Sequence, residues 1–424
     1  MQFRSSLALA ATTVLLITAC GNNAASTRPS TAASTSASVA PATASAAAPS
    51  AAAPSATTAA ASASAPAASA SAGTGGSAAA GEWKIGVVAD VGTVDDKNFN
   101  QYSYEGAQLG AQAVGAEDPQ FVVPASNSEY AGDIQNFIDQ DYNLIVTVGF
   151  NLNTDTLKAA KANPDVWFIG VDQSACVDET GAPDPDFGCA GNASQLLPNF
   201  VGLQYQEDQA GYLAGIVAAS LSENKSVGAI GGINSVPAVV RYIQGYELGA
   251  KSVDDSTKVS TGYVSTSDFG VAFNNPGEGK NYADQFIQTN HPDVLFQVAG
   301  KTGNGVLESA CNNDLVGIGV DVDQWLSLNA DTDAKYQCIV TSAEKHLSNS
   351  VQMTIQQIAS GSVPEVDPFG ALHFNATNDG IGISPEHDSK GLITSDIQTL
   401  IDNAIAGMKD GSLVTCPENC GTAQ

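Results

Sequence analysis

Short apolar segments alternate with segments of helical spacing from residue 84 onwards. Continuous runs rich in Val and Ile predict buried strands. These strands are expected at Lys84–Ala89, Phe121–Val123, Leu144–Val148, Trp167–Val171, Val227–Ile230, Val294–Val298, Val316–Val320 and Cys338–Thr341. Helices are predicted between them at Tyr102–Val114, Tyr130–Asp139, Asp155–Ala162, Asp208–Leu221, Val236–Val253, Asn281–Thr289, Asn304–Cys311 and Ser348–Ala359.

This alternation is typical of α/β proteins that have parallel sheets with helices on both faces. The series is too long for one open sheet, so we expect two lobes. The first lobe takes residues 82–205 with a return segment near 324–355, and the second takes residues 206–323 with a return segment near 356–420. Residues 204–208 are a candidate crossing. The tail from Gly361, which is rich in Pro, Gly and Asp, is expected to wrap over both lobes.

Acidic residues directly follow three of the predicted strands. They are Asp90, Asp172 and Asp321. Such an Asp is ordinarily a helix cap or a turn residue. Ligands of open α/β sheets, however, bind at the carboxyl ends of the strands. Three carboxylates directed at one crevice therefore predict acceptors for a ligand with several hydroxyl or amino groups.

Phe99 follows the loop after the first strand and is flanked by Asn98 and Asn100. An aromatic ring in this position is interpreted as a stacking platform for a planar group. The alternative is that Phe99 packs beneath the first helix as part of the core.

The N-terminus has the pattern of a secretion signal. A short basic start, Met1–Arg4, precedes the apolar run Leu7–Thr18, which is too short to span a bilayer. The run ends in Ile17-Thr18-Ala19-Cys20, which resembles a bacterial lipobox. Residues 1–19 are thus predicted to be a lipoprotein signal peptide, with Cys20 as the acylated N-terminus of the mature chain. The alternative is an ordinary secretory cleavage site.

Residues 20–81 are dominated by Ala, Ser, Thr, Pro and Gly, with Arg28 as the only charged residue. This composition cannot bury enough apolar surface to offset the entropy of ordering. We therefore predict a disordered tether that holds the folded part away from the membrane.

The formal net charge is −28. An acidic chain is a poor partner for nucleic acid or anionic headgroups, which attract Lys and Arg. Gly300-Lys301-Thr302 lacks the Gly spacing of a phosphate-binding loop, and neither a nucleophile elbow nor a zinc-protease motif occurs in the sequence. The chain is therefore predicted to be neither an enzyme nor dependent on a cofactor.

Six cysteines remain besides Cys20, and outside the cytosol an even number suggests disulfides. The simplest pairing is local: Cys176 with Cys189, Cys311 with Cys338, and Cys416 with Cys420. A zinc site is the alternative, but the sequence has no CxxC pair and its His residues have no ligand-like spacing, so no metal is expected.

Several ordered stretches resemble the basic membrane protein family, the substrate-binding lipoproteins of nucleoside ABC importers. The first is IGVVADVGTVDDKNFNQYSYEG at residues 85–106. The others are VTVGF at 146–150, NPDVWFIGVD at 163–172, AGYLAGIVAA at 210–219, GAIGGI at 228–233, VVRYIQGYELGAK at 239–251, VAGKTGNGV at 298–306 and GIGVDVDQ at 317–324. The resemblance covers about residues 83–360.

The resemblance implies a type I periplasmic-binding fold, in which two Rossmann-like lobes close on a ligand. It also implies a nucleoside held between two Phe rings and bonded by Asp, Asn and Lys. Carried over to this chain, the site comprises Asp90, Phe99, Asn100, Asp172, Gly303, Asp321 and Lys345. The second ring is Phe273 when counted back from Gly279-Lys280, or Phe269 when counted forward from Tyr263, and we favour Phe273.

The function implied is that of a monomeric, lipid-anchored binding protein on the extracytoplasmic face of the cell membrane. It would bind a nucleoside and deliver it to ABC permease subunits. The alternative is a sensor or receptor on the same fold that binds a sugar, a flavin or another small polar ligand. The C-terminal segment with Cys416 and Cys420 departs from the family pattern.

Overall fold

The computed structural model describes residues 83–362, 364–387, 391–416 and 420–421. The predicted signal peptide, Cys20 and the tether lie outside the described residues. Among the described residues, no helix is both long enough and apolar enough to cross a membrane.

The first sheet contains six parallel strands in the order β11-β5-β4-β3-β1-β2. They are β1 (Ile85–Ala89), β2 (Gln120–Val122), β3 (Leu144–Val148), β4 (Trp167–Val171), β5 (Phe200–Tyr205) and β11 (Ala371–Phe374). Every residue of β1 and β3 is buried, as expected for strands covered on both faces.

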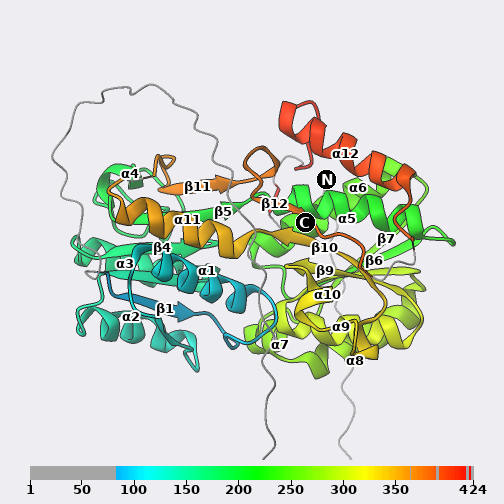
Figure 1. Ribbon diagram of the computed structural model, residues 1–424, viewed down its shortest axis with the longest axis horizontal. Coiled ribbons are helices and arrows are strands. Elements are labelled where there is room, and N and C mark those ends of the chain that lie inside the picture. Colours follow the sequence, from blue (N-terminus) through cyan, green and yellow to red (C-terminus); the bar gives the residue numbers. More distant parts are fainter. Residues whose placement is uncertain (1–82, 363, 388–390, 417–419, 422–424) are drawn as a thin grey trace, which may run out of the picture. The chain divides into compact units, whose positions relative to one another are not determined.

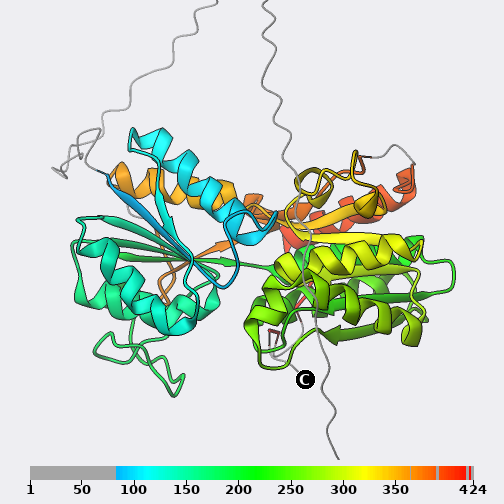
Figure 2. The ribbon, with the colours of Figure 1, turned by 90° about the horizontal axis from the view of Figure 1, so that it is seen from below.

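Helices cover both faces of this sheet (Figure 2). Helix α1 (Phe99–Val114) packs against α11 (Leu347–Ala359), and α2 (Tyr130–Ile138) packs against α3 (Asn153–Ala162). The helix α4 (Ala193–Leu196) and the 3₁₀ turns η1 (Asn127–Glu129) and η2 (Phe150–Leu152) complete the first lobe.

The second sheet has the order β12-β10-β9-β8-β6-β7, in which only the β10–β12 pair is antiparallel. Its strands are β6 (Ser226–Gly231), β7 (Lys258–Tyr263), β8 (Val294–Val298), β9 (Val316–Asp321), β10 (Ile339–Lys345) and β12 (Ile381–Ile383). Its helices and turns are α5 (Glu207–Leu221), α6 (Pro237–Val253), α7 (Phe269–Asn274), α8 (Pro276–Asn290), α9 (Gly300–Asn312), α10 (Gln324–Ser327), η3 (Ala334–Tyr336), η4 (Ala376–Asn378) and α12 (Ser395–Asp410).

The two sheets repeat one topology (Figure 1). In each, the first strand of the lobe lies between the second and the third strands, and later strands extend the sheet on one side only. In sheets of this order, the carboxyl ends of the strands beside that reversal form the usual ligand crevice. The two-lobed α/β prediction is therefore confirmed. The ligand site is expected at the carboxyl ends of the strands beside these reversals.

The return segments differ from the sequence-based expectation. Residues 324–355 were expected to return to the first lobe, but β10 pairs with β9 in the second sheet. The return instead begins with α11 and ends with β11. Helix α11 can lie against α1 because Gly106 has no side chain: a Cβ there would be 2.7 Å from the Ser348 carbonyl oxygen.

Several elements were not predicted. Strand β5 was not predicted, although its residues are mostly buried and apolar, and only its last two residues fall within the candidate crossing at 204–208. Helix α12 lies in the tail that was expected to wrap over both lobes, where no helix was predicted. Thr394 caps this helix by accepting a hydrogen bond from the Ile397 N–H.

The disulfide prediction is confirmed, because the structure pairs the six cysteines locally. The Cα–Cα distances are 4.6 Å for Cys176–Cys189, 5.1 Å for Cys311–Cys338 and 5.4 Å for Cys416–Cys420.

Candidate functional site

A cavity of about 730 Å³ lies at the carboxyl ends of strands from both sheets. The loops after β1, β3 and β4 supply one wall, and elements of the second lobe from α6 to β10 supply the other. Its lining residues are Asp90, Val91, Asp96, Phe99, Asn100, Gly149, Phe150, Asn151, Asp172, Val236, Ala238, Val239, Tyr242, Phe273, Val298, Gly300, Lys301, Val320, Asp321 and Lys345.

Most of the predicted site residues meet in this cavity. Those that line it are Asp90, Phe99, Asn100, Asp172, Phe273, Asp321 and Lys345. Of the two candidates for the second ring, only Phe273 is a lining residue. Phe269 packs beside it, with the ring centroids 6.1 Å apart.

Gly303 is not among the lining residues. It is buried in α9, where a Cβ would lie 1.6 Å from the Gln297 side-chain oxygen. Glycine at this position lets α9 approach Gln297, whose amide donates to the Gln324 side chain at 2.5 Å. The geometry therefore gives Gly303 a packing role behind the strand ends, and its ligand contact stays a prediction.

Phe99 is held in place by the loop that precedes it. The Asp96 carboxylate accepts hydrogen bonds from the backbone N–H groups of Asn98, Asn100 and Gln101 at 2.8–3.1 Å. A carboxylate at this position satisfies N–H groups that a helix N-terminus leaves without partners. Phe99 is the first residue of α1, so this cap fixes where its ring enters the cavity.

Phe273 comes from the opposite lobe. Its ring lies against two glycines that follow strands of the second sheet: a Cβ at Gly232 would be 2.5 Å from the ring, and one at Gly300 would be 3.7 Å away. Glycines at these two points thus leave room for the aromatic ring beside the strand ends.

Asp90 is a partly buried acceptor at the reversal point of the first sheet. Its carboxylate accepts from the Tyr130 hydroxyl, from Val91 N–H at 2.6 Å and from the Asn151 amide at 3.1 Å. Burial raises the pKa of Asp90, and these hydrogen bonds act in the opposite direction.

Asp172 and Asp321 have the same unusual backbone. Their φ angles are 58° and 64°, in the left-handed region that Asp tolerates better than most residues. A buried glutamine follows each of them closely. Gln173 donates to the Gly149 carbonyl at 2.9 Å, and Gln324 accepts from Val320 N–H at 3.0 Å. Both carboxylates are thus presented by rigidly bonded strand ends.

Lys345 lies at the centre of the charged groups and is almost completely buried. Its Nζ is 2.7 and 2.9 Å from the two oxygens of Asp172, 3.0 Å from Glu207 Oε1 and 3.9 Å from Asp321 Oδ1. Burial by itself lowers the pKa of the ammonium. The three carboxylates outweigh this effect and raise it, so Lys345 is charged.

The carboxylates around Lys345 differ in charge state. Burial raises the pKa of Asp321 to about 7, although Lys345 opposes the rise and Tyr242 donates to Asp321 at 3.2 Å. Burial would also raise the pKa of Glu207, but Arg241 and Lys345 outweigh it and bring that pKa below its usual value. Burial also raises the pKa of Asp172, and Lys345 opposes that rise. Within this cluster, Asp321 is the carboxylate whose pKa is brought to about 7.

Aromatic rings enclose the same ammonium. The Lys345 Nζ lies 5.2 Å from the ring centroid of Phe99, 5.1 Å from that of Tyr205 and 5.7 Å from that of Tyr242. These distances fall in the range of cation–π attraction.

The loop after β1 also bonds to the second lobe. Lys301 Nζ donates to the Thr93 hydroxyl at 3.3 Å, and Asn304 donates to the Asp96 carbonyl at 3.2 Å. The Ser327 hydroxyl donates to the Lys97 carbonyl at 2.8 Å. The loop that carries Phe99 therefore connects the two walls of the cavity.

Several polar residues of the site were missed from the sequence: Asp96, Asn151, Tyr242 and Lys301 line the cavity, and Glu207 and Arg241 lie behind it. Arg241 had a recognisable signal, because it interrupts the apolar run Val239–Ile243 of a predicted helix in a chain with few cations. Glu207 had none, since acidic residues are common in the first turn of any helix.

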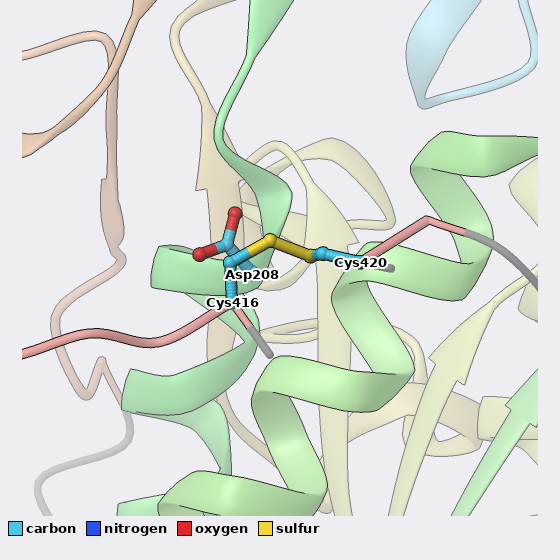
Figure 3. Close-up of side chains that lie close together, drawn as sticks. All are labelled: Asp208, Cys416 and Cys420. Atoms are coloured by element: carbon cyan, nitrogen blue, oxygen red, sulfur yellow. A yellow bond between two sulfur atoms is a disulfide. The ribbon is translucent and has the colours of Figure 1, made fainter. Parts of the chain in front are cut away.

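One further group of potential metal ligands occurs among the described residues: Asp208, Cys416 and Cys420, with ligand atoms within 4.8 Å of one another. Figure 3 shows that the two sulfur atoms are joined as a disulfide. Bonded to each other, they offer no thiolate ligands. The Asp208 carboxylate instead accepts a hydrogen bond from the Thr415 hydroxyl at 2.5 Å.

Comparison with known proteins agrees with this geometry. The chain is 28% identical to a Lactococcus lactis protein named ABC transporter nucleoside-binding protein BmpA, over 78% of this chain and 88% of that protein. It is 26% identical to the CD4+ T-cell-stimulating antigen of Listeria monocytogenes, over 78% and 87%.

Solved structures share the fold. An ABC transporter solute-binding protein from Aeropyrum pernix aligns with a TM-score of 0.63 at 21% identity, over 80% of this chain and 94% of that one. One from Conexibacter woesei aligns with a TM-score of 0.58 at 22% identity, over 80% of this chain and 100% of that one.

Residues 84–410 match the sequence profile described as "Bmp: ABC transporter substrate-binding protein PnrA-like". The chain therefore belongs to the family of PnrA-like substrate-binding proteins of ABC transporters, and it is a binding protein rather than an enzyme.

Proposed function

We propose that this protein binds a nucleoside in the cavity between its two lobes and delivers it to the permease subunits of an ABC importer. The observation that carries the proposal is the combination of two aromatic residues from opposite lobes with buried carboxylates and a lysine in the same cavity. A nucleoside has the matching parts, a planar base and a sugar with several hydroxyl groups.

The base is assigned to the space between Phe99 and Phe273. Stacking of a base on an aromatic side chain contributes roughly 1–3 kcal/mol. Asn100 lines the same space, and in the described part of the chain its buried side-chain oxygen has no hydrogen-bond partner. A buried amide without a partner fits the polar edge of a base, because an unsatisfied polar group is costly to bury.

The sugar is assigned to Asp172, Asp321 and Lys345. The Lys345 Nζ and Asp321 Oδ1 are 3.9 Å apart, too far for a direct hydrogen bond. One hydroxyl group between them can accept from the ammonium and donate to the carboxylate. A sugar hydroxyl in this position would thus connect the two groups.

Closure of the lobes would stabilise the bound state. A ligand shifts such an equilibrium only by its differential affinity for the closed form. A nucleoside that contacts Phe99 in one lobe and Phe273 in the other has this property, because both contacts require the lobes to be close together. We propose that the protein acts as a monomer.

We propose that the mature chain is anchored by acyl groups on Cys20 at the extracytoplasmic face of the cell membrane, with residues 20–81 as the tether. The support is the sequence of the lipobox and of the segment behind it. Cell fractionation tests this: Cys20→Ala should release the protein from the membrane fraction. A wild-type protein that is already soluble and unmodified at Cys20 would contradict it.

The nucleoside assignment is tested by mass spectrometry of the ligand that remains bound through purification, with a thermal-shift screen of nucleosides, free bases, pentoses and flavins. We expect a nucleoside to be retained, and nucleosides to raise the melting temperature more than bases or pentoses do. Binding of a pentose or a flavin without nucleoside binding would refute the assignment and favour the sensor or receptor alternative.

A further inference from the structure

We propose that Glu207 and Arg241 are positioning residues for Lys345, and that together they hold its ammonium between the two strand-end aspartates. The inference deepens the proposed function and rests on it. Glu207 is completely buried, and its two carboxylate oxygens have different partners. Oε1 lies 3.0 Å from Lys345 Nζ, and Oε2 accepts from Arg241 Nε at 2.5 Å.

Neither residue of the pair lines the main cavity. Glu207 is the first residue of α5, directly after the chain leaves the first sheet. Arg241 lies one turn into α6 and lines a second cavity of about 480 Å³, which adjoins the first at Asp172. The pair therefore acts on the ligand through Lys345 and not by contact.

The charge balance explains why Lys345 needs both partners. Asp172, Glu207 and Asp321 carry negative charges when they are ionised, and Lys345 and Arg241 are the cations that offset them within this group. With all five ionised, the buried cluster has an excess of one negative charge. Loss of Arg241 would increase this excess to two, whereas loss of the Glu207 charge would remove it.

Asp321 is the group that responds to this balance. The charged and titratable groups that act on it are Lys345 from β10, Asp172 after β4, Glu207 from α5 and Tyr242 from α6. More negative charge nearby disfavours its ionised form, and less favours it. The pair thus sets whether Asp321 is available as a charged acceptor for a ligand hydroxyl at neutral pH.

The C-terminal segment covers the pair on another side. Thr415 bonds Asp208, the neighbour of Glu207, and Gly421 N–H donates to Gln244 of α6 at 2.9 Å. A Cβ at Gly421 would be 3.2 Å from a terminal nitrogen of Arg241. The segment that departs from the family pattern therefore packs against the first turns of the two helices that carry the pair.

The experiment measures where Asp321 titrates in the empty protein. The unfolding free energy of each variant is recorded between pH 4 and pH 9 in two backgrounds, with Asp321 intact and with Asp321→Asn. The difference between the two curves gives the pH midpoint at which Asp321 titrates. We expect Arg241→Gln to raise the midpoint by about one pH unit and Glu207→Gln to lower it by about one unit. The double variant should return close to the wild type, and Arg241→Lys should keep the wild-type midpoint.

A merely structural role would lower the stability of both single variants without opposite shifts, and that result would overturn the proposal. Lys225→Gln, which removes an exposed pair with Asp254, serves as the matched control and should leave the midpoint unchanged. If a single variant does not fold, the double variant and Arg241→Lys decide. A midpoint in either of them that differs from the wild type would contradict the proposal.

Nucleoside affinity measured over the same pH range separates the two claims. We expect affinity to follow the shifted midpoints and to fall by about tenfold at neutral pH in Arg241→Gln. If the wild type binds no nucleoside, the proposed function fails, while the midpoints of the empty protein still judge the positioning role. If nucleoside binds but the midpoints do not move in opposite directions, only the positioning role is lost.

Discussion

Asp172 and Asp321 occupy equivalent places in the two lobes, yet their environments differ. Asp172 directly follows β4 and Asp321 is the last residue of β9, and these two strands hold equivalent places in their sheets. Both residues have a left-handed backbone conformation and line the same cavity. Asp172 holds Lys345 with both oxygens, whereas Asp321 is 3.9 Å from the same ammonium and accepts from Tyr242.

This difference shows how a repeated fold can produce an asymmetric site. The backbone repeat places a carboxylate on each wall, but a single lysine on β10 can bond closely to only one of them. Asp172 has an ionic partner at hydrogen-bond distance within the protein, so it holds Lys345 as well as taking part in the proposed sugar contact. Asp321 lacks one, and it is therefore the carboxylate that a ligand hydroxyl can satisfy.

The largest effect is expected from the group that both aspartates share. Lys345→Met would leave Asp172 and Glu207 buried near each other without their common cation. Breaking a buried pair in this way costs about 3–5 kcal/mol of unfolding free energy. Urea unfolding measures the loss. Lys301→Met is the matched control, since Lys301 makes one hydrogen bond with Thr93, and it should cost about 1 kcal/mol or less. Equal losses would contradict the central place of Lys345.

The pH dependence of stability should distinguish the two aspartates. Because the pKa of Asp321 is raised to about 7 from an ordinary value of 3.8, the folded protein holds a proton that the unfolded chain has released. The contribution of Asp321 to stability is thus present below pH 3.8 and is lost as the pH rises towards 7, by about 1.4 kcal/mol per pH unit.

Asp321→Asn should reduce this slope, and the part that remains comes from other groups such as Glu344, whose pKa burial also raises to about 7. Asp172→Asn should retain it and move its midpoint down, because a neighbouring negative charge has gone. Unfolding measured from pH 4 to pH 8 tests both expectations. A slope that survives Asp321→Asn unchanged would show that another group titrates there.

A smaller effect separates two tyrosines near Lys345. Tyr242→Phe removes the hydroxyl that donates to Asp321, so it should raise the midpoint of Asp321 by less than about one pH unit and cost about 1 kcal/mol when Asp321 is ionised. Tyr205→Phe removes a hydroxyl bonded to Ser350 and should leave that midpoint unchanged. Equal shifts would argue that the hydrogen bond from Tyr242 does not control the titration of Asp321.

The walls of the cavity were largely predictable from the sequence. Asp90, Asp172 and Asp321 follow apolar runs that could be recognised as strands, and ligand positions in α/β sheets are tied to strand ends. The resemblance to a known family added Lys345 and Phe273, which no local pattern identifies. Asn100 came with Phe99 in the same motif.

The support behind the walls was not predictable. Glu207 and Lys345 are far apart in the sequence and meet only because α5 and β10 pack in the same lobe. Gly303 failed for the opposite reason: it lies in a matching motif, but packing against Gln297 explains its lack of a side chain. Sequence patterns specify which strand ends face a cleft, but not which distant charges balance one another behind it.

The central claim, that Phe99 stacks on a nucleoside base, is tested most directly by titration calorimetry of the retained nucleoside on wild type and Phe99→Ala, with the melting temperature of each empty protein. We predict that affinity falls by about ten- to a hundredfold while the melting temperature of the empty protein changes little. Unchanged affinity with a lower melting temperature would show instead that Phe99 is part of the core, and would contradict the assignment of the base to this ring.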